Sequence, residues 1–216
     1  MSESHSQSSE NKQLQWLDWA RKLQAIAQNG LTFTTNPFEK ERFESVREIA
    51  ADMIATYSQY EQQSILDLFL NREGYATPKL DVRGVVFRDN QILLVKENVD
   101  GLWTLPGGWV DVNESPGFAV AREVFEESGY SVRTVKLLAL YDKLKHPHPP
   151  ELFHAYKAFF LCEITGYEPS TNIETSDAQF FSEDNLPPLS LPRVIESQIH
   201  RMFEHYRHPD WPTDFD

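Results

Sequence analysis

Three glutamates in the middle of the chain are spaced so that their carboxylates could act together. Glu123, Glu126 and Glu127 stand at positions i, i+3 and i+4 of a segment with helical periodicity. A helix turns by about 100° per residue, so all three side chains fall on one face. Mg²⁺ and similar hard cations take carboxylate oxygens and share them with phosphates. The spacing therefore indicates a cation-binding face, and a solvated acidic face is the alternative.

The residues around these glutamates form a longer pattern. Five residues separate Gly108 from Glu114, seven more lead to Arg122, and the glutamates are followed by Gly129 and the apolar Tyr130. Written out, the pattern is Gly-x5-Glu-x7-Arg-Glu-aliphatic-x-Glu-Glu-x-Gly-apolar. It resembles the Nudix box at every position, and a motif with so many fixed positions is highly specific.

The resemblance implies a fold, an activity and a cofactor. The expected fold class is α+β: a Nudix-type α/β/α sandwich with a mixed sheet over residues 80–208, preceded by a small all-α module. The family hydrolyses nucleoside diphosphates linked to another moiety, with water that bound metal activates. The chain is thus expected to be a Mg²⁺-dependent pyrophosphatase, with Mn²⁺ as a second possible metal. ADP-ribose and CDP-choline are examples of the expected small-molecule substrate.

The same resemblance assigns roles to residues of the box. It implies that Glu123, Glu126 and Glu127 are metal ligands together with the carbonyl oxygen of Gly107. The three glutamates and Arg122 form the expected catalytic group, and pairing of Arg122 with an acid of the box would orient the helix. The remaining fixed positions are expected to be structural: Gly108, Glu114 and Gly129.

The general base is less closely defined. Glu123 is the first choice, but some Nudix members place this carboxylate on a loop outside the box. Glu174 and Asp177 are the candidates for such a loop base. Solvated loop acids are the alternative interpretation for both.

A loop rich in proline and histidine could face the box. Lys143, His146 and His148 in this loop could contact phosphate or ribose and supply the positive charge that an acidic domain lacks. Exposed loop histidines are the alternative interpretation. Two aromatic residues, Trp103 and Tyr141, could stack on a nucleobase. The alternative interpretation is that both side chains pack in the core.

Composition and charge restrict the classes of partner. The chain has 216 residues, 40% of them hydrophobic, and a formal net charge of −13. This composition suits one globular domain with or without a smaller companion. Stable nucleic-acid binding is not expected, because such affinity comes mainly from basic groups. An RNA-directed Nudix hydrolase, acting at 5′ ends or as an exonuclease, and a non-catalytic Nudix-like nucleotide sensor are the alternative functions.

The single cysteine and the N-terminus point to a reducing compartment. Cys162 lies in the apolar run AFFLCEI, cannot form an internal disulfide and is expected to be a buried, inert thiol. The N-terminus is polar, and no stretch approaches the ~20 apolar residues of a membrane span. A cytoplasmic protein without a membrane partner is therefore expected.

The chain before the box domain is expected to be helical. The polar residues 1–12 are predicted to be disordered. An apolar stripe over 13–29 predicts a first helix that ends at Gly30, and the start signal Asn36-Pro37 predicts a second helix. A third, shorter helix completes a module over 13–73.

This helical module is too small to bury its own apolar faces. A homodimer formed through it is therefore expected. Its sequence is similar to the helical domain that precedes the Nudix domain in a subgroup of bacterial ADP-ribose or CDP-choline pyrophosphatases.

Strands are predicted on both sides of the box helix. Apolar alternation, β-branched runs and turn signals place them at 82–86, 92–95, 130–141, 154–164 and 179–181. The pair Asp89-Asn90 predicts a hairpin turn, and residues 192–206 predict a C-terminal helix. The tail after Arg207 shows no pattern.

Overall fold

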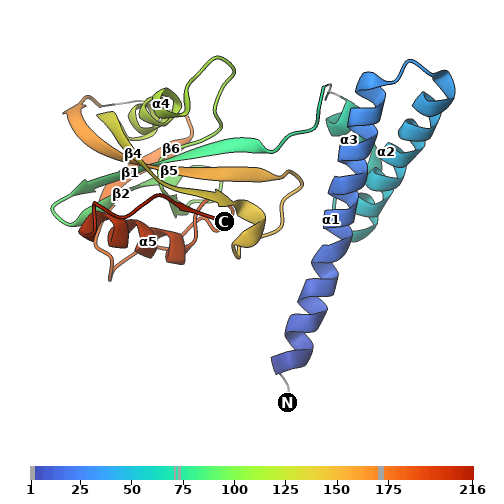
Figure 1. Cartoon of the computed structure of the whole chain (residues 1–216). Coiled ribbons are helices and arrows are strands. Elements are labelled where there is room, and N and C mark those ends of the chain that lie inside the picture. Colours follow the sequence, from blue (N-terminus) through green and yellow to red (C-terminus); the bar gives the residue numbers. More distant parts are fainter. Residues whose placement is uncertain (1–2, 71, 73, 170–172) are drawn as a thin grey trace. The chain divides into compact units, whose positions relative to one another are not determined.

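The computed structural model describes residues 3–70, 72, 74–169 and 173–216. The chain divides into two compact units, Met1–Thr77 and Pro78–Asp216 (Figure 1). Among the described residues, the first holds helices and no strand, and the second holds a sheet with helices. The predicted α+β fold class is confirmed.

Three helices make up the first unit: α1 (Glu3–Phe33), α2 (Pro37–Tyr57) and α3 (Gln62–Leu70). The start of α2 is as predicted, because the side chain of Asn36 accepts a hydrogen bond from the Phe38 amide at 2.9 Å. Helix α1 begins earlier than the residue 13 that the apolar stripe suggests. Residues 1–2 and the side chains up to residue 14 lie outside the described part, so the disorder of residues 1–12 stays a prediction.

Gly30 does not end the first helix, contrary to expectation. Helix α1 continues through it to Phe33. A Cβ atom at position 30 would lie 2.4 Å from the ring of Phe43 on α2. The glycine is needed for the close approach of two helices rather than for a left-handed cap, a distinction that helical periodicity cannot make.

The second unit is built on one mixed sheet. Its strands are β1 (Lys79–Arg88), β2 (Gln91–Glu97), β3 (Trp103–Thr104), β4 (Tyr130–Asp142), β5 (Ala155–Tyr167), β6 (Thr175–Phe181) and β7 (Asp214–Phe215). The strand order is β3-β2-β1-β5-β4-β7, and β6 pairs with β2. The pairs β1–β5 and β4–β7 are parallel and the others are antiparallel. Asp89 and Asn90 form the predicted hairpin turn, with φ of 51° and 60°.

Two helices cover opposite faces of this sheet (Figure 1): α4 (Pro116–Ser128) and α5 (Glu196–Arg207). One core cluster joins α4 to the sheet and includes Val82, Val86 and Val124. The other joins α5 to the sheet and includes Val85 and Phe203. Alternate residues of a strand point to opposite faces, so β1 contributes to both clusters. The arrangement is the α/β/α sandwich that the box resemblance implies.

The C-terminal region differs from the sequence-based expectation in two ways. A turn around Pro192 precedes α5, in which the Val194 amide donates to the Ser190 carbonyl, so the helix begins later than predicted. The tail, which shows no pattern in sequence, adds β7 beside β4. Its Asp214 accepts hydrogen bonds from Arg201 Nη2 at 2.9 Å and from the Tyr141 hydroxyl at 3.1 Å.

Cys162 lies on β5 inside the core cluster beneath α4. Burial raises the pKa of its thiol to about 12. The predicted burial of this thiol is confirmed.

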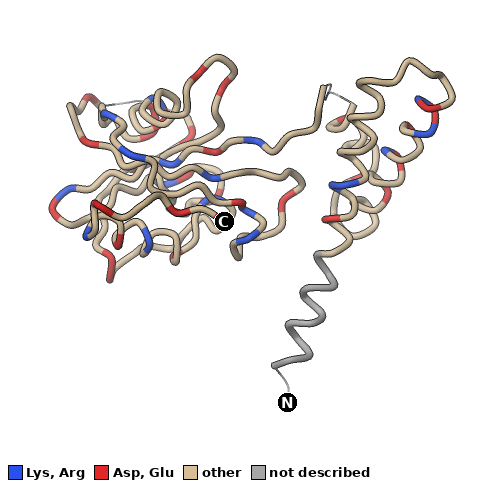
Figure 2. Tube along the Cα trace, in the orientation of Figure 1, with Lys and Arg blue, Asp and Glu red and all other residues tan. Residues whose placement is uncertain are grey.

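Charged residues are spread over both units. The chain has 33 acidic and 20 basic residues, and Figure 2 shows the two kinds interspersed along the trace. Positive charge near any one site must therefore come from individual residues that the fold brings there. None of the helices in the described ranges is long and apolar enough to cross a bilayer.

Candidate active site

Helix α4, which carries the glutamates, is fixed at both ends. The hydroxyl of Ser115 accepts a hydrogen bond from the Phe118 amide at 3.3 Å, and Pro116 occupies the first turn. At the other end Gly129 is left-handed, with φ of 77°, and its amide donates to the Phe125 carbonyl at 2.8 Å. These caps define where the glutamates stand on the helix.

Two glycines bring the preceding loop against the glutamates. Gly107 has φ of 144°, and a Cβ there would lie 2.0 Å from the Val82 carbonyl oxygen. Its amide donates to Glu127 Oε2 at 2.8 Å. A Cβ on Gly108 would lie 2.9 Å from Glu123 Oε1. A larger residue at position 107 would push the loop from the strand backbone, and one at position 108 would displace the Glu123 carboxylate.

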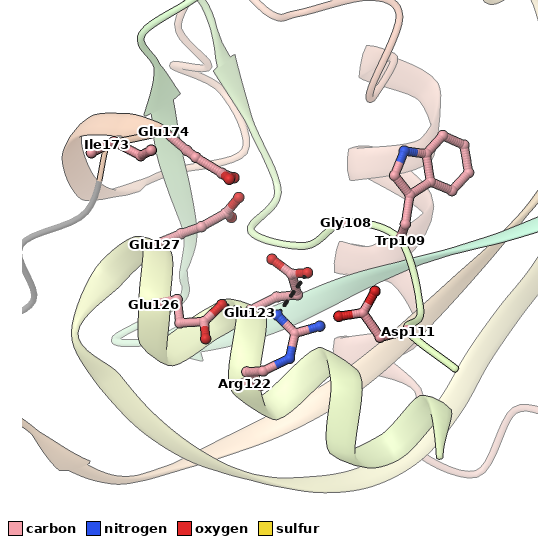
Figure 3. Close-up of a pocket in the computed structure, with 9 residues that line it drawn as sticks. All are labelled: Gly108, Trp109, Asp111, Arg122, Glu123, Glu126, Glu127, Ile173 and Glu174. Carbon is pink, nitrogen blue, oxygen red and sulfur yellow. Dashed lines mark hydrogen bonds and ion pairs between the residues drawn. The ribbon is translucent and has the colours of Figure 1, made fainter. Parts of the chain in front are cut away.

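A cavity of about 540 Å³ opens over the glutamate face of α4. Figure 3 shows the carboxylates of Glu123, Glu127 and Glu174 pointing toward a common space. The acid of the later loop thus lies opposite the box helix. The lining residues are Gly108, Trp109, Asp111, Arg122, Glu123, Glu126, Glu127, Ile173 and Glu174.

Arg122 links the acids of the box. Its Nε and Nη2 each donate to the Glu114 carboxylate at 2.9 Å. Its Nη1 donates to Glu123 at 3.1 Å and to Glu126 at 2.9 Å. The hydrogen bonds with Glu114 raise the pKa of Arg122 and hold the pKa of Glu114 below its usual range. One guanidinium therefore offsets part of the repulsion among three carboxylates.

Burial disfavours the charged forms of two glutamates. The side chain of Glu127 is only 7% exposed, and burial raises its pKa to about 8 against the opposing effects of Arg83 and the Gly107 amide. Burial also raises the pKa of Glu123, and Arg122 opposes this. Both carboxylates would gain from a nearby cation.

The donor set fits a hard divalent cation. The cavity presents carboxylate oxygens, the ligands that Mg²⁺ and Mn²⁺ favour. Within the described ranges, however, no three acidic, histidine or cysteine side chains are close enough together to form a preassembled metal cluster. Glu123 and Glu126 are instead paired with Arg122.

Three of the predicted site residues lie away from this cavity. Trp103 packs edge-on against Phe181, with 4.8 Å between ring centroids, and Tyr141 is buried with its hydroxyl on Asp214. Asp177 lies within β6, where its carboxylate accepts from the amide of Ala178. None of the three is among the described lining residues, because the strands turn their side chains elsewhere.

The two histidines of the proline-rich loop contact other parts of the protein. His148 contacts the Leu191 carbonyl through Nδ1 at 2.8 Å and Gln198 through Nε2 at 3.0 Å, so it ties its loop to α5. Burial lowers its pKa to about 4. His146 lies against the Tyr141 ring, with 4.4 Å between centroids. The loop itself begins with a short 3-10 helix, η1 (Lys143–Lys145).

Acid should weaken the fold through His148. An unfolded histidine binds a proton near pH 6.5, whereas folded His148 does so only near pH 4. Between these values the unfolded state holds more protons, so stability falls as the pH drops from about 6.5 to 4. We expect this histidine to account for about 1–2 kcal/mol of that loss. Urea unfolding across the window should show a shallower pH slope for His148→Gln than for the wild type.

The exposed His208 provides the control for this measurement. His208→Gln should keep the wild-type slope, since that side chain is not buried. Equal slopes for His148→Gln and the wild type would contradict the prediction.

Sequence reasoning missed three residues of the cavity: Ile173, and the pair Trp109 and Asp111. Both residues of the pair follow Gly108 in the run GGWVD, and their place beside the box could have identified them. Figure 3 shows the Trp109 ring pointing away from the glutamates. Trp109 also lines a second cavity.

Comparison with known proteins agrees with this geometry. Residues 77–202, more than half of the chain, match the NUDIX domain family. The chain belongs to the Nudix family. Residues 14–69 match a domain described as UDP-X-like, N-terminal oligomerisation domain. The predicted family and the predicted class of activity, a Nudix pyrophosphatase, are confirmed.

Two relatives resemble this Nudix hydrolase over nearly its whole length. It is 48% identical over 204 residues to YjhB of Bacillus subtilis (strain 168), which is named as a putative ADP-ribose pyrophosphatase. This match covers 94% of this chain and 98% of YjhB. A crystal structure of an ADP-ribose pyrophosphatase from Streptococcus suis 89-1591 is 44% identical, with a TM-score of 0.60, over 65% of this chain and 100% of that one. The structure of a UDP-X diphosphatase is 30% identical, with a TM-score of 0.62, over 94% and 99% of the two chains.

Proposed function

We propose that this Nudix hydrolase cleaves the pyrophosphate bond of ADP-ribose, or of a closely similar nucleoside diphosphate derivative, with Mg²⁺ or Mn²⁺ as cofactor. The observation that carries the proposal is the cavity in which Glu123, Glu127 and Glu174 point toward a common space beside Gly108. The similarity to proteins named as ADP-ribose pyrophosphatases, nearly full-length for YjhB, supports the choice of substrate.

In this proposal the glutamates and the Gly107 carbonyl hold the divalent cation. When bound, the cation neutralises charge on the phosphate oxygens and makes water easier to deprotonate. The buried Glu127 is oriented by the Gly107 amide, and Arg122 aligns Glu123 and Glu126. These contacts keep the acids in place before the substrate arrives.

A carboxylate of the cavity then accepts the proton of the attacking water. Glu123 remains the first choice for this base. Glu174 is the alternative, because it lines the same cavity from a different segment of the chain. Asp177 is a weaker candidate than Glu174, since its carboxylate bonds within β6.

A substrate panel tests the function. With Mg²⁺, the enzyme should convert ADP-ribose to AMP and ribose 5-phosphate, and excess EDTA should abolish turnover until Mg²⁺ or Mn²⁺ is restored. CDP-choline and a 5′-triphosphorylated RNA oligomer are the comparison substrates. Release of nucleotide from the RNA alone would favour the RNA-directed alternative. Calorimetric binding of ADP-ribose without turnover in Mg²⁺ would favour a nucleotide sensor.

We also propose that the first unit forms a homodimer. Trp19, Ile26 and Phe33 are spaced seven residues apart on α1 and are 51%, 54% and 68% exposed, so they form one apolar stripe. Its match to an oligomerisation domain supports a helix of a second copy as its partner. Light scattering should give the mass of two chains. Ile26→Glu should reduce this to one chain, whereas Glu41→Lys, which changes an exposed residue of α2, should not. A wild-type monomer would contradict the proposal.

A further inference from the structure

A second cavity lies next to the glutamate cavity and has a different chemical character. Its volume is about 300 Å³, and it shares Gly108 and Trp109 with the first. Its charged lining comes from β1, from η1 and the loop that follows it, and from the turn before α5: Asp81, Arg83, Lys143, Glu151 and Arg193. A substrate held at the glutamates can thus extend past Gly108 into a compartment with both donors and acceptors.

A buried ion cluster lies beside this compartment. The Asp81 carboxylate accepts from Arg83 Nε at 2.8 Å and also binds Lys157 from the neighbouring strand β5. Arg83 Nη1 donates to the Leu105 carbonyl at 3.0 Å. Two cations therefore share one carboxylate, and the charges of Glu127 and Glu97 also help to raise the pKa of Arg83. The lining is rigid because each of these groups is hydrogen-bonded.

Ion pairs also form the rest of the lining. Lys143 is buried and lies 2.5 Å from Glu151. Arg193 lies 2.9 Å from Glu97 and 3.4 Å from Asp100. Paired cations and carboxylates present alternating donors and acceptors, which suits a ligand with several hydroxyl groups.

Trp109 supplies an aromatic wall. The residue lines both cavities and is 44% exposed, and its ring points away from the glutamates (Figure 3). The ammonium of Lys79 lies over this ring, 4.9 Å from its centroid. A sugar can pack its C–H face on an aromatic ring while its hydroxyls bond to charged neighbours. A quaternary ammonium would instead compete with Lys79 for the ring. It would also be repelled by the positive charges of Arg83 and Lys143.

We propose that the second cavity binds the phosphosugar half of the substrate, with the sugar against Trp109 and its hydroxyls on the Lys143–Glu151 pair. The inference rests on the proposed pyrophosphatase function. It makes the enzyme selective for nucleoside diphosphates that carry a sugar over those that carry choline. A nucleobase fits this compartment less well, because it needs apolar contacts on both faces and the cavity offers one aromatic wall among charged groups.

The test compares substrates and product inhibition in the full-length enzyme with Mg²⁺. Wild-type kcat/KM should be at least about tenfold higher for ADP-ribose than for CDP-choline. Trp109→Leu and Lys143→Met should each lower kcat/KM for ADP-ribose about tenfold, mainly through KM. Lys145→Met, which changes an exposed lysine of the same 3-10 helix, should leave both substrates unchanged.

Product inhibition separates the two halves of the substrate. Ribose 5-phosphate should inhibit the wild type, and both cavity variants should raise its inhibition constant at least about tenfold while that of AMP changes less than about twofold. Circular dichroism verifies that the variants fold. Equal effects on ribose 5-phosphate and AMP, or none on either, would overturn the inference. No hydrolysis of any nucleoside diphosphate derivative by the wild type would instead refute the proposed function.

Discussion

Glu127→Gln is expected to lower kcat for ADP-ribose at least about 100-fold while the protein stays folded. The amide has nearly the same volume and its oxygen can still accept the hydrogen bond from Gly107. It carries no negative charge, however, and cannot replace a carboxylate beside a divalent cation. Steady-state kinetics with saturating Mg²⁺ measure the loss.

The stability of this variant should differ little from that of the wild type. Burial already disfavours the ionised form of Glu127, so a neutral side chain removes an unfavourable charge from the interior. Glu163→Gln is the matched control, because Glu163 is an exposed residue paired with Arg133 on the sheet. It should keep full activity. Full activity in Glu127→Gln would refute the assigned role of the glutamate.

Asp81→Asn is expected to destabilise the fold by about 3–5 kcal/mol, because it leaves two buried cations without a counter-charge. Arg83 and Lys157 both bind the Asp81 carboxylate, and both are among the least exposed charged residues of the chain. Urea unfolding at pH 7 measures the change. Asp67→Asn, on the surface of α3, should cost less than about 0.5 kcal/mol.

A double variant separates charge from packing. Adding Lys157→Met to Asp81→Asn restores the net charge of the cluster and should recover more than about 1 kcal/mol of the lost stability. A cost below about 1 kcal/mol for the single variant would show that water or another residue compensates the cations. Additive effects of the two substitutions would show that Asp81 and Lys157 do not interact.

Several features of this protein follow from short sequence segments. The glutamate spacing, the Ser115 and Asn36 caps, and the Asp89-Asn90 turn depend on interactions within a few residues. Such interactions are encoded locally, so residue type and position suffice to predict them. The Nudix family assignment has the same origin, because the box is one continuous segment.

Packing decided the features that sequence periodicity left open. A glycine at position 30 is typical of a helix end. Gly30 instead lies inside α1, where the helix packs closely against Phe43 of α2. Trp103 and Tyr141 were candidates for stacking on a base, but Trp109 is the aromatic residue that reaches the cavities. A strand segment does not reveal which face will be covered, because that depends on the helices laid over the sheet.

The sequence by itself determined the Nudix box, and hence the family and the class of bond that is cleaved. Only the tertiary structure placed Glu174, rather than Asp177, opposite the box helix, and brought Asp81 beside Lys157 through the pairing of β1 with β5. These neighbours are far apart along the chain. Their proximity depends on strand register and loop path, which arise from the whole sheet, so the proposed determinants of substrate choice became visible only once the chain was folded.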